Sequence, residues 1–218
     1  MAVVYYGAKG LANVCFRTFG RWEVHGVEGV PPKGRLLVVA NHLSNADPAV
    51  VMAAIPRRLR YLAKNGLFRN PLFTALLHAL GVYPLDRSGR DARALRWMLQ
   101  SLEEEAAVVM FPEGTRGTDG MRKVGRGVAY VALKSGTAIL PVGITGTENV
   151  RTFRRIPFPF CRMKVEIGQP FSLPSVEGDV SDPVLDSLAD MIMMRIAALL
   201  PPDYRGVYGG KAAGAGRA

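Results

Sequence analysis

The residues whose types and spacing could do chemistry are a histidine and an aspartate five positions apart, His42 and Asp47. A histidine can act as a general base when a carboxylate holds its imidazole in the required tautomer. An aliphatic segment at 36–40 precedes the pair and is typical of a buried strand, while Asp47 followed by Pro48 is typical of a helix start with Asp as the N-cap. Taken alone, this spacing favours a loop histidine before an ordinary helix cap, because it arises often by chance.

Strand-like and helix-like segments alternate along the chain, and this alternation predicts the fold that positions His42 and Asp47. Alternating elements indicate a single α/β domain with a largely parallel central sheet flanked by helices. We expect an amphipathic helix at 1–21, the folded domain at 22–202, and a flexible tail rich in Gly and Ala at 203–218. Strands are predicted at 22–27 (an edge strand), 35–40, 61–63, 81–85, 106–111, 139–144 and 164–167, and helices at 3–20, 48–55, 67–80, 89–105, 125–135 and 183–200.

The N-terminal segment has the spacing of a basic amphipathic helix. Apolar residues such as Leu11 and Phe16 recur on one side, and Lys9, Asn13 and Arg17 recur at four-residue steps on the other. Such a helix can lie in a membrane interface or pack on its own domain, and the pattern supports both interpretations equally.

The amino-acid composition limits the kinds of molecule that the protein is expected to bind. The 218 residues carry a formal net charge of +10 and are 49% hydrophobic, which favours an anionic partner such as a lipid surface, nucleic acid or an acidic protein. We find no zinc-finger spacing, aromatic sheet signature or basic helical run, so no nucleic-acid partner is expected. The two cysteines match no metal spacing, and no metal site is predicted. Without a span of about 20 apolar residues or a signal-peptide pattern, we expect a protein at the cytoplasmic face of the membrane, peripheral or monotopic.

Three further predicted strand ends raise the probability that His42 belongs to a site. The first predicted strand leads to Arg87, the second is followed by Gly114 and Arg116, and the third includes residues 140–144. Ligands of α/β proteins bind at the carboxyl ends of strands, and guanidinium groups recognise phosphate in a planar, multidentate manner. Two arginines beside a His-Asp pair therefore indicate an anionic substrate, most plausibly a phosphate.

These segments resemble, in order, the motifs of the glycerolipid acyltransferases, in particular the 1-acylglycerol-3-phosphate acyltransferases. N-H-L-S-N-A-D at 41–47 is similar to the first motif, and F-P-E-G-T-R at 111–116 matches the third completely. Residues 81–87 resemble the second motif and 140–142 the fourth, while A-K-N-G-L-F at 63–68 is similar to a further conserved segment. The chain departs from the family pattern at Pro84-Leu85, where a Phe-Ile type of pair is commoner, and at Gly66, where Glu is common.

The resemblance implies a mechanism without an enzyme nucleophile or a cofactor. His42 would take the proton of a glycerol hydroxyl, which attacks an acyl thioester carried by acyl carrier protein or coenzyme A. Asp47 would hold the imidazole and stabilise the imidazolium. Arg116 would bind the substrate phosphate with help from Arg87 and Lys64, and the loop would be shaped by Glu113, Gly114 and Thr115, with Glu113 pairing with an arginine.

The expected substrate is lysophosphatidic acid, converted to phosphatidic acid, and the expected partners are an acyl thioester and a membrane surface. A second membrane-contacting segment is the loop 151–160, which interleaves arginines with Phe153, Phe158 and Phe160, although these aromatics could also fold back onto the core. Two alternatives stay open. One is acylation of glycerol 3-phosphate, a lysophospholipid or an amino lipid, and the other is a non-catalytic basic module that binds membranes or nucleic acid.

Overall fold

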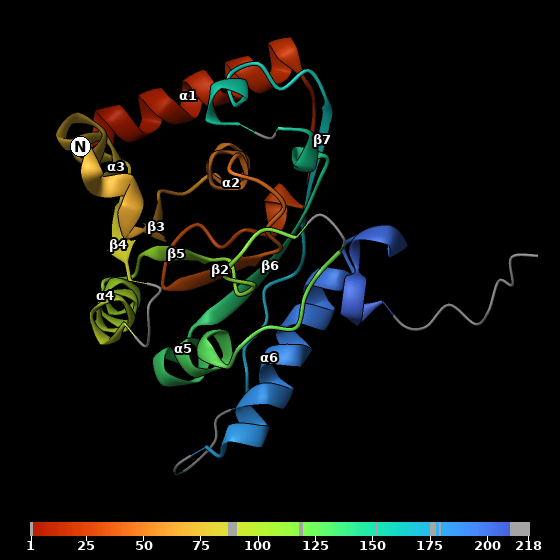
Figure 1. Ribbon diagram of the computed structural model, residues 1–218. Coiled ribbons are helices and arrows are strands. Elements are labelled where there is room, and N and C mark those ends of the chain that lie inside the picture. The colour runs from red at the N-terminus through yellow and green to blue at the C-terminus, as the bar shows by residue number, and fades with distance from the viewer. Residues whose placement is uncertain are drawn as a thin grey trace, which may run out of the picture.

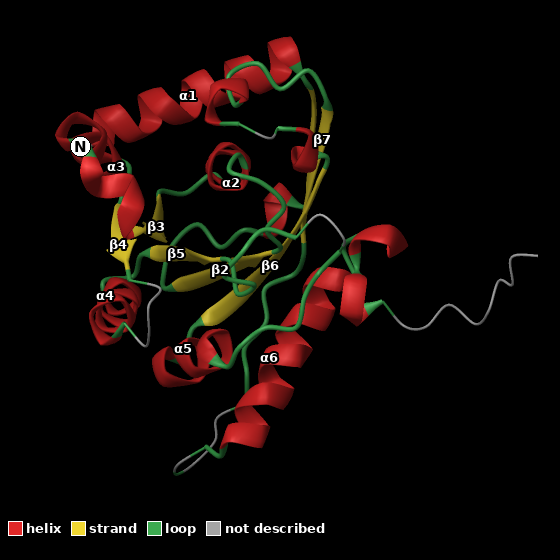
Figure 2. Cartoon of the chain, in the orientation of Figure 1, coloured by secondary structure: helices red, strands yellow, loops and turns green. Residues whose placement is uncertain are grey.

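The computed structural model describes residues 2–86, 91–117, 120–150, 152–174, 178 and 180–209 and shows one mixed sheet with helices on both faces (Figures 1 and 2). The sheet order is β1-β7-β6-β2-β5-β3-β4. The strands are β1 (Arg21–His25), β2 (Leu36–Ala40), β3 (Leu59–Lys64), β4 (Val82–Leu85), β5 (Ala107–Met110), β6 (Ala138–Thr145) and β7 (Arg162–Ile167). The helices are α1 (Ala2–Phe19), α2 (Asp47–Ala54), α3 (Pro71–Ala79), α4 (Ala92–Glu103), α5 (Gly127–Ser135) and α6 (Asp182–Ala197).

The prediction of a largely parallel sheet is confirmed. β4, β3, β5, β2 and β6 pair in parallel, so their carboxyl ends lie along the same edge. β7 pairs antiparallel to β6, and β1 pairs parallel to β7, so the last two strands run against the other five. β1 is an edge strand, as the alternation at 22–27 predicts.

The central strand β2 separates two apolar cores. Its side chains alternate between the faces of the sheet with the period of two that a strand imposes. Leu36 and Val38 pack with residues of α1 and α2, whereas Leu37 and Val39 pack with residues of α4, α5 and α6. All five residues of β2 are buried, which explains the uninterrupted aliphatic run.

Capping side chains move two helix starts away from the predicted positions. α4 begins at Ala92 rather than at 89, because the Asp91 carboxylate accepts hydrogen bonds from the N–H groups of Arg93 and Ala94. The Asn70 side chain caps α3 in the same way, so the predicted helix at 67–80 divides into a 3₁₀ helix at Asn65–Arg69 and α3.

Helix α1 differs from the two-sided helix that the spacing predicts. Its Tyr5 and Phe16 are buried, but the polar side chains of Lys9 and Asn13 turn inward as well and donate hydrogen bonds to the carbonyl oxygens of Ile55 and Ala53. These carbonyls lie at the C-terminal end of α2, where the last C=O groups have no partner within the helix. Tertiary contact with α2 thus reverses part of the expected polarity of α1.

The segment where the sequence predicts the start of a flexible tail is folded over its described part. It forms 3₁₀ helices at Pro202–Tyr204 and Gly206–Tyr208. The rings of Tyr204 and Tyr208 pack against the core that α4, α5 and α6 share with the sheet. Residues 210–218 lie outside the described part of the chain.

Candidate active site

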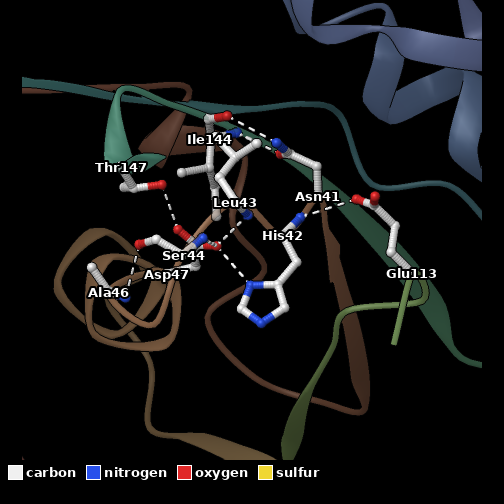
Figure 3. A network of polar contacts seen from close by, with 9 residues as sticks. All are labelled: Asn41, His42, Leu43, Ser44, Ala46, Asp47, Glu113, Ile144 and Thr147. Atoms are coloured by element: carbon white, nitrogen blue, oxygen red, sulfur yellow. Dashed lines mark hydrogen bonds and ion pairs between the residues drawn. The ribbon is translucent and has the colours of Figure 1, made fainter. Parts of the chain in front are cut away.

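The site is built at the carboxyl end of β2, where Asn41 ties the strand end to β6. The buried Asn41 amide donates to Ile144 O at 2.9 Å and accepts from Ile144 N at 2.8 Å (Figure 3). Two hydrogen bonds to one backbone residue fix both the position and the orientation of the amide. The next residue, His42, therefore leaves the sheet from a defined point.

The His42 imidazole contacts the Asp47 carboxylate directly. Nδ1 of His42 lies 2.7 Å from Oδ2 of Asp47. Because an ionised carboxylate can only accept, Nδ1 carries the hydrogen in this contact, and Nε2 of the neutral ring keeps a free lone pair. Figure 3 shows this second nitrogen pointing away from Asp47. The ring also stacks on Phe111, with centroids 4.5 Å apart, and is only 13% exposed, so its orientation is restrained from two sides.

The Asp47 carboxylate is fully buried and accepts four hydrogen bonds. Oδ2 accepts from the N–H groups of Leu43 and Ser44 at 2.6 and 2.8 Å and meets the His42 ring, while Oδ1 accepts from Thr147 Oγ1 at 2.6 Å. A buried carboxylate is costly unless such donors surround it. The prediction that Asp47 is the N-cap is wrong. Ala46 is the N-cap and makes no side-chain cap bond, so the Asp47 oxygens are directed back to the loop that carries His42.

Glu113 connects the loop after β5 to His42 through backbone amides. Its Oε1 accepts from His42 N at 3.1 Å and its Oε2 from Arg122 N at 3.2 Å, while Gly117 N donates to His42 O at 3.0 Å. The expectation that Glu113 pairs with an arginine side chain is thus replaced by two bonds to backbone N–H groups. Burial raises the pKa of Glu113 above its ordinary value, and the two N–H donors oppose that rise.

The same loop presents Arg116 to a hollow beside the His-Asp pair. Gly114 has φ 64°, in the left-handed region that favours glycine, and the chain turns there. The hollow has a volume of about 650 Å³ and begins next to His42, since Leu43 and Ser44 form part of its wall. The remaining lining residues are Asn45, Thr115, Arg116, Glu148 and Asn149.

The predicted phosphate-binding residues are not all brought together. Arg116 lines the hollow and is exposed. Lys64 ends β3, which is separated from β2 by β5, and it does not line this hollow. Arg87 lies outside the described residues. A further hollow of about 410 Å³, lined by Arg57, Arg60 and Ala107 among others, lies at the opposite, amino-terminal ends of β3 and β5.

Sequence reasoning missed two residues that hold the pair in place, Asn41 and Thr147. Asn41 immediately precedes His42 in a segment already singled out, so its amide was a candidate for tying the strand end. Thr147 is buried and lies 100 positions from Asp47, and its only local signal is its place just after a predicted buried strand.

Comparison with known proteins agrees with the motifs and the fold. The Acyltransferase family matches residues 21–145. This chain belongs to the Acyltransferase family. A 1-acyl-sn-glycerol-3-phosphate acyltransferase of Borreliella burgdorferi is 34% identical over 129 residues, covering 58% of this chain and 52% of that protein. An N-acylphosphatidylethanolamine synthase of Arabidopsis thaliana is 29% identical over 210 residues, covering 83% and 72%.

The fold of this family member has a counterpart among solved structures. The crystal structure of the 1-acyl-sn-glycerophosphate acyltransferase PlsC from Thermotoga maritima matches with a TM-score of 0.69 at 24% identity, over 91% of this chain and 80% of that one. The chain spans about half the length of the first curated relatives that it matches. No helix in the described residues is long and apolar enough to cross a bilayer.

The network around Asp47 makes a prediction for Thr147→Val. The change keeps the side-chain shape but removes the hydrogen bond to Asp47 Oδ1, which leaves a buried carboxylate oxygen without its partner. We expect a loss of about 1–3 kcal/mol in the free energy of unfolding, measured by denaturant titration. Thr18→Val, at an exposed position of α1, is the control and should change it by less than about 0.5 kcal/mol. Equal values for the two variants would contradict the assigned bond.

Proposed function

We propose that this acyltransferase moves an acyl chain from a thioester to the free hydroxyl of 1-acylglycerol 3-phosphate, giving phosphatidic acid for phospholipid synthesis. The observation that carries the proposal is the His42 ring, held at Nδ1 by a buried carboxylate. Its neighbours in the chain, Leu43 and Ser44, line the same hollow as Arg116. The names of several relatives, which are 1-acyl-sn-glycerol-3-phosphate acyltransferases, support the choice of acceptor.

The proposed reaction uses the acceptor hydroxyl itself as the nucleophile. Nε2 of His42 takes the hydroxyl proton as the oxygen attacks the thioester carbonyl, and Asp47 stabilises the imidazolium that forms. Collapse of the tetrahedral intermediate leaves a new C–O bond and breaks the C–S bond, and the imidazolium returns its proton to the leaving thiolate. Neither cysteine serves as a nucleophile in this reaction. Cys15 lies on α1, and burial raises the pKa of the Cys161 thiol, which keeps that thiol protonated.

The acyl donor and the cofactor requirement follow from this reaction. A thioester of coenzyme A or of acyl carrier protein supplies an activated acyl group, so the reaction needs no further cofactor. The positive net charge of +10 suits the phosphates of coenzyme A and the acidic surface of a carrier protein alike.

We further propose a peripheral position at the cytoplasmic face of the membrane, because the acceptor is an amphiphile. The outer side of α1 exposes Val3, Leu11 and Val14, and the loop after β6 exposes Phe158 and Phe160. The rings of Phe158 and Phe160 contact Phe19 at the end of α1, with centroids 4.8 and 5.8 Å away, so helix and loop present one continuous apolar surface. Of the loop 151–160, Arg151 lies outside the described residues.

Helix α3 extends this apolar surface. It contacts α1, and its Leu72 is 83% exposed, with Phe73 and Leu76 also exposed. Single exposed apolar residues are ordinary, but several on adjoining elements mark an interaction surface.

Acylation of another lipid acceptor is the second candidate. The N-acylphosphatidylethanolamine synthase of Arabidopsis thaliana covers more of both chains than the first 1-acylglycerol-3-phosphate relatives do. The same His-Asp chemistry would serve an amine or a hydroxyl acceptor, so the acceptor has to be determined by assay.

The first test measures thiol release from an acyl thioester by the purified chain with 1-acylglycerol 3-phosphate, glycerol 3-phosphate and lysophospholipids as acceptors. We expect His42→Ala to lower turnover about 10²–10⁴-fold, the range of general base catalysis, with the fold retained but a lower melting temperature, because one hydrogen bond to the buried Asp47 is lost. Asp47→Asn should also lower turnover, but it replaces an acceptor by a donor within a buried network, so its folding is checked first. No thiol release by the wild type with any acceptor, together with lipid or nucleic-acid binding, would favour a non-catalytic module instead.

The second test separates acceptor binding from chemistry at Arg116. Arg116→Ala should raise the KM for the phosphate-bearing acceptor about tenfold or more, because a hydrogen bond to a charged group is lost, and should leave kcat nearly unchanged. Arg96→Ala, on the exposed side of α4, is the matched control. An acceptor KM that is the same in both variants would remove Arg116 from the binding site.

The third test is flotation with liposomes that contain anionic lipid. Deletion of α1 would remove Tyr5 and Phe16, which are buried in the core, so substitutions on the outer side are the sharper experiment. We expect Leu11 and Val14 changed to Ser, or Phe153, Phe158 and Phe160 changed to Ser, to lower the floating fraction. Val184→Ser with Met194→Ser, which are exposed on α6 at the other face of the sheet, is the control. Undiminished flotation of both outer-surface variants would refute the assigned surface.

A further inference from the structure

The C-terminal segment at 201–208 lies against both of the loops that hold the His-Asp pair. One loop follows β5 and carries Glu113, and the other is the turn after β6 that carries Thr147. Figure 3 shows these two residues on opposite sides of the pair, with Glu113 bound to His42 and Thr147 bound to Asp47. No hydrogen bond in the described chain joins the segment to the pair directly, so the segment acts on it through these loops.

The main chain of Tyr204 holds the loop after β5. Its carbonyl oxygen accepts from Met121 N at 3.0 Å, and Val207 N donates to Met121 O at 3.0 Å. Gly206 permits this close approach, because it has φ 51° and a Cβ added there would lie 2.1 Å from Met121 O. Met121 is therefore bound on both of its backbone groups by the C-terminal segment.

The position of Met121 determines that of the next residue, Arg122, which reaches the site through its N–H group. Arg122 N donates to Oε2 of Glu113 at 3.2 Å, and Oε1 of the same carboxylate accepts from His42 N at 3.1 Å. A carboxylate bound at both oxygens has a defined position and plane. Tyr204 thus restrains the main chain of His42 through Arg122 and Glu113.

The side chain of Tyr204 holds the turn after β6. Its hydroxyl donates to Oε1 of Glu148 at 2.7 Å. Burial and this bond raise the pKa of Tyr204 to about 12, so the hydroxyl stays protonated and donates. Glu148 follows Thr147 in the 3₁₀ helix at Thr147–Asn149, and Thr147 Oγ1 donates to Asp47 at 2.6 Å. The hydroxyl therefore restrains the turn that supplies a donor to Asp47.

We propose that Tyr204 is a positioning residue of the active site, which holds His42 through its main chain and Asp47 through its hydroxyl. The inference rests on the proposed acyl transfer and deepens it. The general base has to lie within hydrogen-bond distance of the acceptor hydroxyl, and a displacement of about 1 Å costs on the order of 10²-fold in rate. One residue bound to both loops limits such a displacement. The C-terminal segment, which composition assigns to a flexible tail, is thus part of the framework of the site.

The first experiment tests the hydroxyl. Tyr204→Phe keeps the ring and both main-chain bonds but releases Glu148. In thiol release with 1-acylglycerol 3-phosphate as acceptor, we expect kcat to fall about tenfold, because a hydrogen bond to a charged group is lost, and KM to stay within about twofold. Tyr208→Phe is the control, since its hydroxyl donates to Asp190 on α6 at 2.9 Å, and kcat should not change.

The second experiment tests the main-chain contact. The methyl group of Gly206→Ala would overlap Met121 O, so the segment and the loop have to separate and Arg122 N moves away from Glu113. We expect kcat to fall about 10–10²-fold. Gly125→Ala is the control in the same loop, because a Cβ at Gly125 meets no atom within 4 Å, and kcat should not change.

A double-mutant cycle separates positioning from a general structural effect. In the His42→Ala background the group that Tyr204 positions is absent, so Tyr204→Phe should lower the residual turnover no further. An equal proportional loss in the wild-type and His42→Ala backgrounds would show that the hydroxyl acts independently of the general base, and would overturn the proposal.

Failure of this proposal is distinguishable from failure of the proposed function. No thiol release by the wild type with any acceptor refutes the proposed function. Release with the same kcat in Tyr204→Phe and Tyr208→Phe refutes only the role of Tyr204, and so does a raised KM with kcat retained. If the melting curve of Gly206→Ala shows that it does not fold, Tyr204→Phe, which adds no atom, decides alone.

Discussion

The buried carboxylate of Asp47 is the constraint on which the site depends. A charge removed from water requires several donors, and here they come from two parts of the chain. The turn at 42–44 supplies the His42 ring and two N–H groups, and the Thr147 hydroxyl comes from the segment after β6. Satisfying the carboxylate therefore positions the turn, the histidine and the segment after β6 at once. The proposed general base is oriented by the same bonds that make the burial of Asp47 tolerable.

The sheet brings these donors together because β5, β2 and β6 are neighbours and run in the same direction. Their carboxyl ends supply Glu113, His42 and Thr147 to one edge, the usual place for ligands in this class of fold. After β6 the chain has to turn sharply out of the sheet. Gly146 does so at φ 85°, where a Cβ would lie 1.8 Å from Arg162 O, so no other residue fits between β6 and Thr147 without displacing the backbone of β7.

The described surface carries two regions with different chemistry. The hollow lined by Arg116 and Glu148 is polar and suits a headgroup, while the outer side of α1, the loop after β6 and α3 expose apolar side chains that suit a lipid surface. An acyltransferase acting on amphiphiles needs both, since the headgroup and the chain of one substrate prefer different surroundings. The packing of Lys9 and Asn13 on α2 makes the apolar outer side possible, because it turns polar groups of α1 inward.

The sequence by itself determined the α/β class, because strand and helix periodicities are local, and the family, because the motifs at 41–47 and 111–116 are contiguous strings. It also brought His42 and Asp47 into one turn, since five positions separate them. Only the tertiary structure decided which distant residues complete the site. Thr147 meets Asp47 across 100 positions, Asn41 meets Ile144 across 103, and Tyr204 meets Glu148 across 56. These contacts follow from strand order and from the packing of the C-terminal segment, which no local pattern of residues encodes.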